Sequence, residues 1–439
     1  MFIMNHKELA KWAVQFALDN GAQACRVSLG TGSSSEFEYR DTQLDKLQQA
    51  AENGLSITLF VNNRYGNYST NRIDQKELKQ FIKKGIETTG YLAEDPARQL
   101  PDPSRYYKGG GHDLKLVDEN FSSVEADDKL ALAKAAVEEV YGADPRIISV
   151  TGSFNDGESR NYLVDSNGFE GETKSTYYSL SASVSMKGEG DARPSDWWYD
   201  TALQWDELQK SGIGKKAMER TMRKLGQQKI KSGKYAMLVD NLNSGRLLTP
   251  LISAMYGNAL QQKNSFLLDK LNTKIVSDKL TLTDDPHITH ARGARWFDHE
   301  GVATVKRQVI EKGVLQTYFI DTYISKKLNV EPTISSPSVL TFEPGNKNFD
   351  QLMASLKKGI WITGFNGGNS NSTTGDFSFG VEGFLIENGK VVKPVSEMNI
   401  TGNLLTLWSN VAEIGNDPRL DRSWRTPSVL FDNVDFSGL

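Results

Sequence analysis

The residues best suited to chemistry in this sequence are histidines and carboxylates around position 290. His287 and His290 are followed by His299, and the nearby acidic residues are Asp284, Asp285, Asp298 and Glu300. Imidazole nitrogens can bind zinc, and a zinc peptidase also needs a carboxylate base. However, the chain lacks an H-E-x-x-H motif, and Pro286 indicates a polar loop rather than the rigid support that metal ligands require. We therefore interpret this segment as a loop that leads into a strand, and keep the three histidines as an alternative metal site.

Other common catalytic and nucleotide-binding motifs are absent. The sequence contains no G-x-x-x-x-G-K-[ST] loop, no G-x-G-x-x-G after a strand, no G-x-S-x-G elbow and no C-x-x-C pair. Its single cysteine, Cys25, cannot form an internal disulfide, and its neighbours are small or apolar. We expect Cys25 to be a buried structural thiol rather than a nucleophile.

Length and composition indicate a soluble, multi-domain protein. The chain has 439 residues, 38% of them hydrophobic and 24% charged, with a formal net charge of −4. This balance gives no overall attraction to nucleic acid or to an anionic membrane. Charged residues follow the apolar residues 1–4 at once, and no apolar run reaches the roughly 20 residues that span a bilayer. We expect a cytoplasmic protein without an export signal.

Hydrophobic periodicity and turn residues predict an α+β fold in two lobes. The N-terminal lobe should contain helices with small antiparallel sheets, divided into subdomains at 1–95 and 112–231; the C-terminal lobe, 232–439, should be mixed α/β. Spacing predicts helices over 5–20, 75–92, about 124–142, 205–231 and 349–358, and the dipeptides at 156–157, 167–168 and 388–389 predict turns between strands.

A glycine-rich run over residues 366–383 is a candidate peptide cleft. Its glycines allow close approach of a backbone, and its polar side chains could bind an extended peptide. The candidate residues are Asn369, Asn371, Thr373, Thr374, Gly375, Asp376 and Ser378. The alternative interpretation is a turn-rich connection between strands that is held by its own side-chain hydrogen bonds.

A basic segment over residues 210–234 raises the alternative of nucleic-acid binding. Lys216, Arg220 and Arg223 would share one face of a helix and could contact phosphates. Apolar residues on the opposite side favour an ordinary amphipathic helix with a solvated basic face. We therefore do not expect nucleic acid as a partner.

Several long segments resemble one known family. They are ARGARWFDHEGVAT, KGVLQTYFIDTYISKKL, STTGDFSFGVEGFLIENGKVVKPVSEMNITGNLL and IGND. Together with the N-terminal helix and hairpin, they are similar to the TldD/PmbA family, whose members are called modulators of DNA gyrase. The resemblance covers nearly the whole chain and implies the two-lobed fold of that family.

The resemblance also places the family's zinc motif. The TldD branch carries H-E-x-x-x-H on a helix, and the corresponding segment here is GRLLTPLISA. Thr249 and Ala254 stand at the two histidine positions, and Pro250 stands at the glutamate position. None of these side chains can serve as zinc ligand or base, and Thr249 and Pro250 instead suit the start of a helix over 250–261. The chain therefore resembles the PmbA/TldE branch, which lacks its own metal site.

This resemblance implies a non-catalytic subunit that supports a TldD-like zinc metalloprotease in peptide processing or in degradation of unfolded proteins. No cofactor is expected in this chain, and zinc is expected in the partner. The expected partners are the TldD-like subunit and a peptide or unfolded protein, with a homodimer as an alternative assembly. Two other functions stay open: a self-sufficient metal-dependent peptidase with a non-standard site, and a DNA gyrase modulator.

Overall fold

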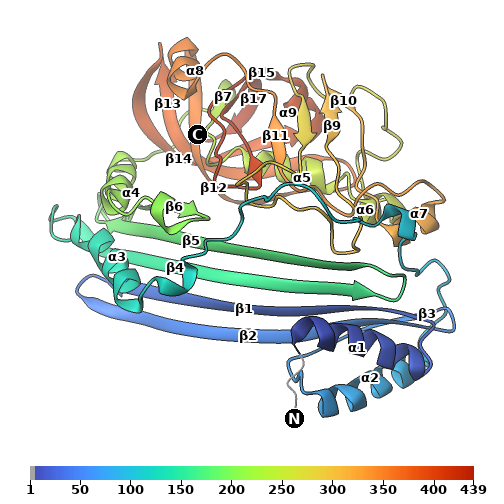
Figure 1. Ribbon diagram of the computed structural model, residues 1–439. Helices are drawn as coiled ribbons and strands as arrows, with labels where there is room; N and C mark the ends of the chain where they lie inside the picture. Colours follow the sequence, from blue (N-terminus) through green and yellow to red (C-terminus); the bar gives the residue numbers. More distant parts are fainter. Residues whose placement is uncertain (1–4) are drawn as a thin grey trace.

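The computed structural model describes residues 5–439 and contains two lobes that face each other (Figure 1). Helices and sheets with mainly antiparallel strand pairs are mixed in both lobes, which confirms the predicted α+β class. In the C-terminal lobe, β12 pairs with β7 and β11 pairs with β16 in parallel. Residues 1–4, which bear on the expectation about an export signal, lie outside the described part. Among the helices of residues 5–439, none combines the length and apolar character needed to cross a bilayer.

One long antiparallel sheet forms the base of the N-terminal lobe. Its strand order is β3-β2-β1-β4-β5-β6, so the segments 1–95 and 112–231 share a single sheet. The strands are β1 (Ala24–Arg40), β2 (Gln43–Val61), β3 (Arg64–Thr70), β4 (Ile147–Asp165), β5 (Glu170–Met186) and β6 (Ser195–Ala202). Several are much longer than the sequence predicted, because small residues in mid-strand allow strands to approach rather than turn. A Cβ on Gly32 would lie 2.8 Å from the Glu158 carbonyl oxygen.

The turn predicted at 156–157 is wrong. Asp156 and Gly157 lie in the middle of β4. Asp156 is buried and pairs with Lys129 at 2.6 Å, while Gly157 leaves room for the Tyr177 ring, which would lie 2.7 Å from an added Cβ. The dipeptide therefore serves packing. The turns at 167–168 and 388–389 are confirmed.

Four helices cover the N-terminal sheet: α1 (His6–Asp19), α2 (Gln75–Thr89), α3 (Ala126–Glu138) and α4 (Ile213–Arg223). The side chain of Asn5 accepts a hydrogen bond from the Glu8 amide at 2.9 Å and caps α1. The helix predicted over 205–231 is much shorter than expected. Gly212 and Gly226 both adopt positive φ, at +79° and +76°, and these left-handed residues flank α4.

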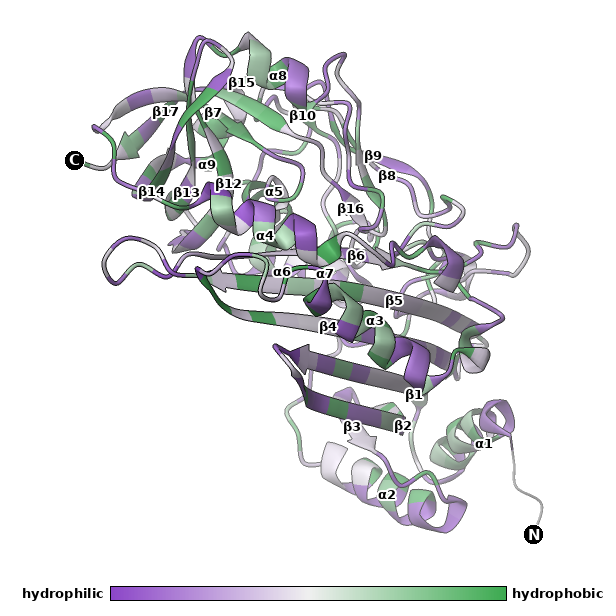
Figure 2. Ribbon diagram, turned by 90° about the vertical axis from the view of Figure 1, so that its left-hand side faces the viewer, coloured by the Kyte–Doolittle hydropathy of each residue, from purple (hydrophilic) through white to green (hydrophobic). Residues whose placement is uncertain are grey.

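The two faces of this sheet differ in polarity, and Figure 2 shows the resulting bands along β1 and β2. Cys25, Val27 and Leu29 on β1 pack in the core beneath α1 and α2. The intervening Arg26 and Ser28 point to the other face, toward the C-terminal lobe. Cys25 is fully buried, and burial raises the pKa of its thiol to about 12, as expected for a structural cysteine.

The C-terminal lobe is built around a second six-stranded sheet, in the order β14-β13-β12-β7-β17-β15. Because β14 also pairs with β17, five of its strands close on themselves. These strands are β7 (Gly233–Val239), β12 (Lys358–Ser370), β13 (Asp376–Glu387), β14 (Lys390–Asn403), β15 (Val411–Ile414) and β17 (Val429–Ser437). A smaller sheet contains β8 (Leu282–Asp284), β9 (Arg307–Glu311), β10 (Val314–Leu315), β11 (Leu340–Phe342) and β16 (Trp424–Arg425).

Five helices belong to this lobe: α5 (Gly245–Ser253), α6 (Gly257–Gln261), α7 (Thr322–Leu328), α8 (Phe349–Ser355) and α9 (Leu404–Ser409). The predicted start of a helix at Pro250 is wrong, because α5 already begins at Gly245 and Pro250 lies inside it. Thr249 is not a cap; its hydroxyl donates to the Gly245 carbonyl at 2.9 Å. The continuous helix over 250–261 is instead two short helices.

A cluster of charges attaches α1 to the sheet. Lys7 and Lys11 each contact Glu170 at 2.5 Å, and the Tyr162 hydroxyl donates to the same carboxylate. Burial alone would raise the pKa of Glu170, but the hydrogen bonds from the two lysines and the tyrosine lower it to about 2. Because this pKa lies below its ordinary value, the interaction stabilises the fold above about pH 4.5 and is lost as the pH falls toward 2.

We predict that Glu170→Gln lowers the free energy of unfolding at pH 7 by about 1 kcal/mol, the range of a partly exposed ion pair. The difference from the native chain should shrink as the pH falls below 4.5, where the unfolded-state carboxyl takes up a proton. Urea unfolding followed by circular dichroism between pH 7 and pH 3 measures this, with Glu119→Gln at an exposed position as control. A pH-independent difference would contradict it.

Candidate functional site

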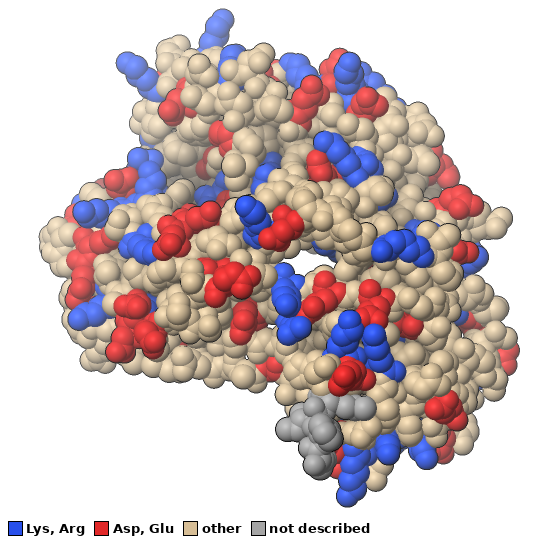
Figure 3. Space-filling model, in the orientation of Figure 1, with Lys and Arg blue, Asp and Glu red and all other residues tan. Residues whose placement is uncertain are grey.

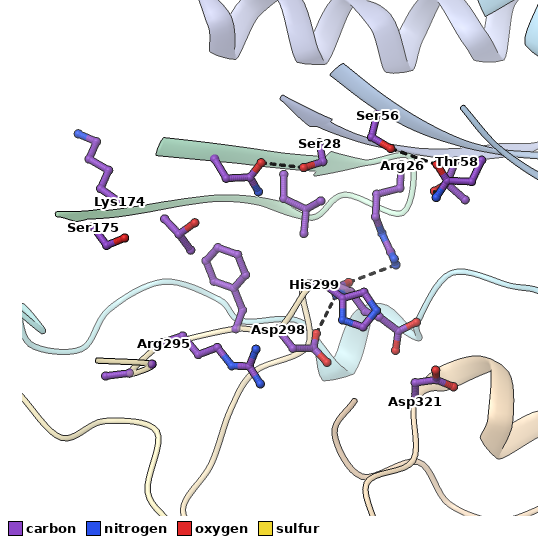
Figure 4. Close-up of a pocket in the computed structure, with 18 of the residues that line it drawn as sticks. Arg26, Ser28, Ser56, Thr58, Lys174, Ser175, Arg295, Asp298, His299 and Asp321 are labelled. Atoms are coloured by element: carbon purple, nitrogen blue, oxygen red, sulfur yellow. Dashed lines mark hydrogen bonds between the residues drawn. The ribbon is translucent and has the colours of Figure 1, made fainter. Parts of the chain in front are cut away.

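A cavity of about 710 Å³ lies between the two lobes, and we call it the inter-lobe cavity (Figure 4). The polar face of the N-terminal sheet forms one wall, and a loop over residues 292–300 together with α7 forms the other. Figure 3 shows an opening between the lobes with acidic and basic side chains at its rim. The volume of the inter-lobe cavity is in the range of pockets that bind small molecules or short peptide segments.

Hydroxyl and amide groups dominate the sheet wall of this cavity. Ser28 donates to Asn161 Oδ1 at 2.7 Å, and Ser56 donates to Asn67 Oδ1 at 3.1 Å. The remaining polar residues of this wall include Thr58, Thr173, Lys174 and Ser175. Such a surface offers both donors and acceptors, and it suits the backbone of an extended peptide better than an apolar ligand.

Two buried carboxylates fix the opposite wall. Asp298 accepts hydrogen bonds from the amides of Glu300 and Val302, at 2.9 and 3.0 Å. Glu300 accepts from the amide and the hydroxyl of Thr322, at 3.0 and 2.9 Å. Burial raises the pKa of Glu300, and the neighbouring Asp298 charge adds to this effect. Both carboxylates therefore hold the turn and α7 in place.

The three histidines do not converge on a metal site. The His287 ring stacks on Trp296 with centroids 4.0 Å apart, and its Nε2 lies 3.0 Å from the Thr304 hydroxyl. His290 pairs with Glu207 at 2.6 Å, whereas His299 is exposed at the inter-lobe cavity. Across residues 5–439 no three His, Cys, Asp or Glu side chains group as metal ligands. Each histidine thus serves a separate local contact, and this geometry gives the alternative metal site no support.

A second cavity, also about 710 Å³, lies beside Thr249 of α5, the helix that the resemblance equates with the family's zinc helix, and we call it the arginine pocket. Arg246 and Thr249 of α5 line it together with Arg292, Arg422 and Asp421. Thr249 offers a hydroxyl, Pro250 offers no donor atom, and Ala254 is buried with 2% exposure. This donor set does not fit a zinc ion, and three guanidinium groups around the same space disfavour any cation.

The glycine-rich run forms the end of the β12–β13 hairpin. Asn371 Oδ1 accepts from the amides of Thr373 and Thr374, and Thr374 donates to Asp376 at 2.7 Å. Asn369 and Ser378 pair across the two strands, and Gly375 has φ +81°. The polar groups thus satisfy one another, as in the alternative interpretation, and the seven candidate residues line neither the inter-lobe cavity nor the arginine pocket.

The basic segment on α4 is largely neutralised by the fold. Arg220 contacts Asp196 at 3.3 Å and Lys224 contacts Glu382 at 2.6 Å, and both basic side chains are mostly buried. Lys216 pairs with Glu219 at 3.6 Å. The predicted phosphate-contacting face of Lys216, Arg220 and Arg223 is therefore not formed, because Arg220 turns into the interior.

Comparisons with known proteins identify the class. The chain matches the PmbA/TldA metallopeptidase domain 1 over residues 25–89, the central domain over 119–225 and the C-terminal domain over 232–438. These three models cover most of the sequence. The chain belongs to the PmbA/TldD metallopeptidase family.

Individual relatives agree with this membership. The Escherichia coli O157:H7 protein named metalloprotease PmbA is 28% identical, covering 98% of this chain and 97% of that protein. A Bacteroides thetaiotaomicron protein described as a candidate modulator of DNA gyrase is 61% identical, with a TM-score of 0.98 and full coverage of both chains. TldE from Thermococcus kodakarensis, 18% identical, shares the fold with a TM-score of 0.85, covering 98% of this chain and all of that one.

The arginine pocket was not predicted from the sequence. Its three arginines lie far apart in the chain, in GRLL, ARGAR and DRSW, and only the fold brings them to one cavity. The available signal was an arginine in each segment, and only Arg246 lies on the helix that corresponds to the family's zinc helix. No periodicity or motif connects them.

The Lys224 ammonium group joins the lobes at the end where α4 lies (Figure 1). It contacts Asp196 of β6 at 3.3 Å and Glu382 of β13 at 2.6 Å, and its side chain is 9% exposed. A buried cation held by two carboxylates is costly to break, because the remaining charges lose their partner.

We predict that Lys224→Met lowers the free energy of unfolding by about 3 kcal/mol. The double variant Lys224→Met/Glu382→Leu should recover most of this loss, because Asp196 keeps Arg220 and no unpaired glutamate remains. Urea unfolding at pH 7 measures both, with Lys215→Met at an exposed position of α4 as control. Equal losses in the single and double variants would show that packing, not charge, is responsible.

Proposed function

We propose that this chain is a non-catalytic, PmbA/TldE-like subunit of a cytoplasmic peptidase assembly. Its partner is a TldD-like zinc metalloprotease, and the pair processes peptides or degrades unfolded proteins. The zinc ion belongs to the partner, and this chain needs no cofactor. The assembly contains both subunits, and a homodimer of this chain is the alternative assembly.

The observation that carries this proposal is the chemistry of α5. Thr249, Pro250 and Ala254 occupy the ligand and base positions, and none can bind zinc or accept a proton from water. A family member that lost only one ligand could still bind zinc weakly. In this chain, however, the three arginines that line the cavity beside Thr249 make that cavity unfavourable for a cation. Family membership therefore supports a role in binding peptides, whereas the side chains at positions 249, 250 and 254 argue against peptide-bond cleavage by this chain.

A subunit without a base can still accelerate proteolysis by holding the substrate. The inter-lobe cavity presents hydroxyls and amides from the sheet on one wall and a rigid turn on the other. An extended peptide bound there loses its freedom before it reaches the partner's zinc, and such pre-orientation lowers the barrier without new chemistry. The self-sufficient peptidase and the gyrase modulator become outcomes of the test.

The test is co-expression with a TldD-like protein from the same organism, followed by cleavage of fluorescent casein. We expect the pair to cleave at least about tenfold faster than the partner alone, a factor typical of improved substrate positioning. This chain alone should give no chelator-sensitive cleavage.

The matched control is the pair in which the glutamate of the partner's zinc motif is changed to glutamine, which should abolish cleavage. If the partner alone cleaves as fast as the pair, the accessory role is wrong. If this chain alone cleaves casein and a chelator stops it, the self-sufficient peptidase replaces the proposal. Salt-sensitive retention on duplex DNA without any effect on cleavage would favour the gyrase-related alternative.

A further inference from the structure

The arginine pocket is a preorganised arrangement of cationic donors. The guanidinium group of Arg422 is fixed from two sides, because its Nε donates to the Tyr199 hydroxyl at 2.8 Å and its Nη1 donates to the Leu242 carbonyl at 3.2 Å. Tyr199 in turn packs against Arg419, whose guanidinium carbon lies 4.8 Å from the ring centroid. The orientation of Arg422 is thus set before any ligand arrives.

Each of the three arginines keeps free donors. Arg422 uses three of its five N–H groups on Tyr199 and Leu242, so two remain unpaired by the described residues. Arg246 donates to the Gly368 carbonyl at 3.1 Å through one nitrogen. Arg292 lies over the Tyr177 ring, 5.7 Å from its centroid, and is exposed.

The negative charge in this pocket is already engaged. Asp421 is the only acidic residue among those that line the pocket within residues 5–439. It binds Arg419 in a bidentate pair at 2.9 and 2.7 Å. Three guanidinium groups therefore face the cavity against one carboxylate that has its own cation, which leaves a net positive site.

Arg292 connects the arginine pocket with the inter-lobe cavity, because it lines both. The adjacent Gly293 fixes its loop close to the segment that carries Arg422. At φ +90°, an added Cβ on Gly293 would lie 2.7 Å from Ser423 Cβ and 2.9 Å from the Ser338 carbonyl oxygen. The close approach of these loops holds the arginines at the junction of the two cavities.

We propose that the arginine pocket binds the C-terminal carboxylate of a peptide whose preceding residues lie in the inter-lobe cavity. Guanidinium groups bind carboxylates through paired hydrogen bonds, and the pocket supplies several unpaired N–H groups in a fixed place. The position that holds a cation in the catalytic branch would thus hold an anion in this chain. This inference rests on the proposed handling of peptides and specifies which end of the peptide is recognised.

The experiment measures binding of an N-terminally fluorescein-labelled hexapeptide to the purified chain by fluorescence anisotropy. The same peptide is made with a free C-terminal carboxylate and with a C-terminal amide. We expect the acid to bind at least about tenfold more tightly, because charge-assisted hydrogen bonds are lost in the amide. Inorganic phosphate should displace the acid peptide, as expected for an oxyanion site.

Variants locate the effect. Arg292→Gln and the double variant Arg246→Gln/Arg292→Gln, both at exposed positions, should reduce the acid-to-amide preference stepwise without unfolding the chain. Arg422→Gln should abolish the preference, and Arg193→Gln, at an exposed arginine outside this pocket, is the matched control. Unfolding curves confirm that each variant is folded.

Equal binding of acid and amide by the native chain, or an acid preference that is undiminished in the double variant and in Arg422→Gln, would overturn the carboxylate site. Phosphate binding without discrimination between acid and amide would show an adventitious ion only and would also overturn it. The measurement uses this chain alone, so its failure is distinguishable from failure of the accessory role, which is read from the paired cleavage assay.

Discussion

The structure depends on contacts that join the two lobes at several points, and two of these contacts are ion pairs at opposite ends of the inter-lobe cavity. At one end, the buried Lys224 ammonium links β6 to β13 through Asp196 and Glu382. At the other, Asp95 accepts from the Tyr323 hydroxyl at 2.9 Å and pairs with Lys327 of α7 at 3.0 Å. These ion pairs are directional and favour one relative orientation of the lobes, and they act together with an apolar cluster that packs Leu163 and Phe169 against Phe297.

The alternation of side chains along the long strands determines what lines the inter-lobe cavity. One face of the N-terminal sheet is covered by helices where its strands are buried, and there alternate residues, such as Leu55, Ile57 and Leu59 on β2, pack in a core. The other face is released from packing and carries serines, threonines and asparagines. The same alternation extends to β6, where Trp198 packs in the helix-covered core and Tyr199 orients Arg422 on the opposite face. The alternation of side chains thus gives the sheet one face that packs in a core and one polar face that lines the cavities.

Sequence patterns correctly predicted the helices and turns that depend on residues close together in the chain. The helix capped by Asn5 and the hairpin at Asn388 and Gly389 were predictable, because each depends on neighbouring residues. The long strands β1 and β4 were not, since Gly32 and Gly157 serve contacts with segments far along the chain. The resemblance located the helix that corresponds to the family's zinc helix, but the arginines that line the cavity beside it come from three distant segments. Only the tertiary structure brings these arginines together, and no periodic pattern in the sequence predicts that they meet.

The central claim is that the position of the family's metal in this chain is an anion site and not a cation site. Anomalous diffraction at the zinc absorption edge, from crystals of the chain grown with zinc, tests it directly. The account predicts no zinc peak beside Thr249, because the arginine pocket, which Thr249 lines, offers three guanidinium groups and no imidazole. A fully occupied zinc bound by residues of α5 would contradict it.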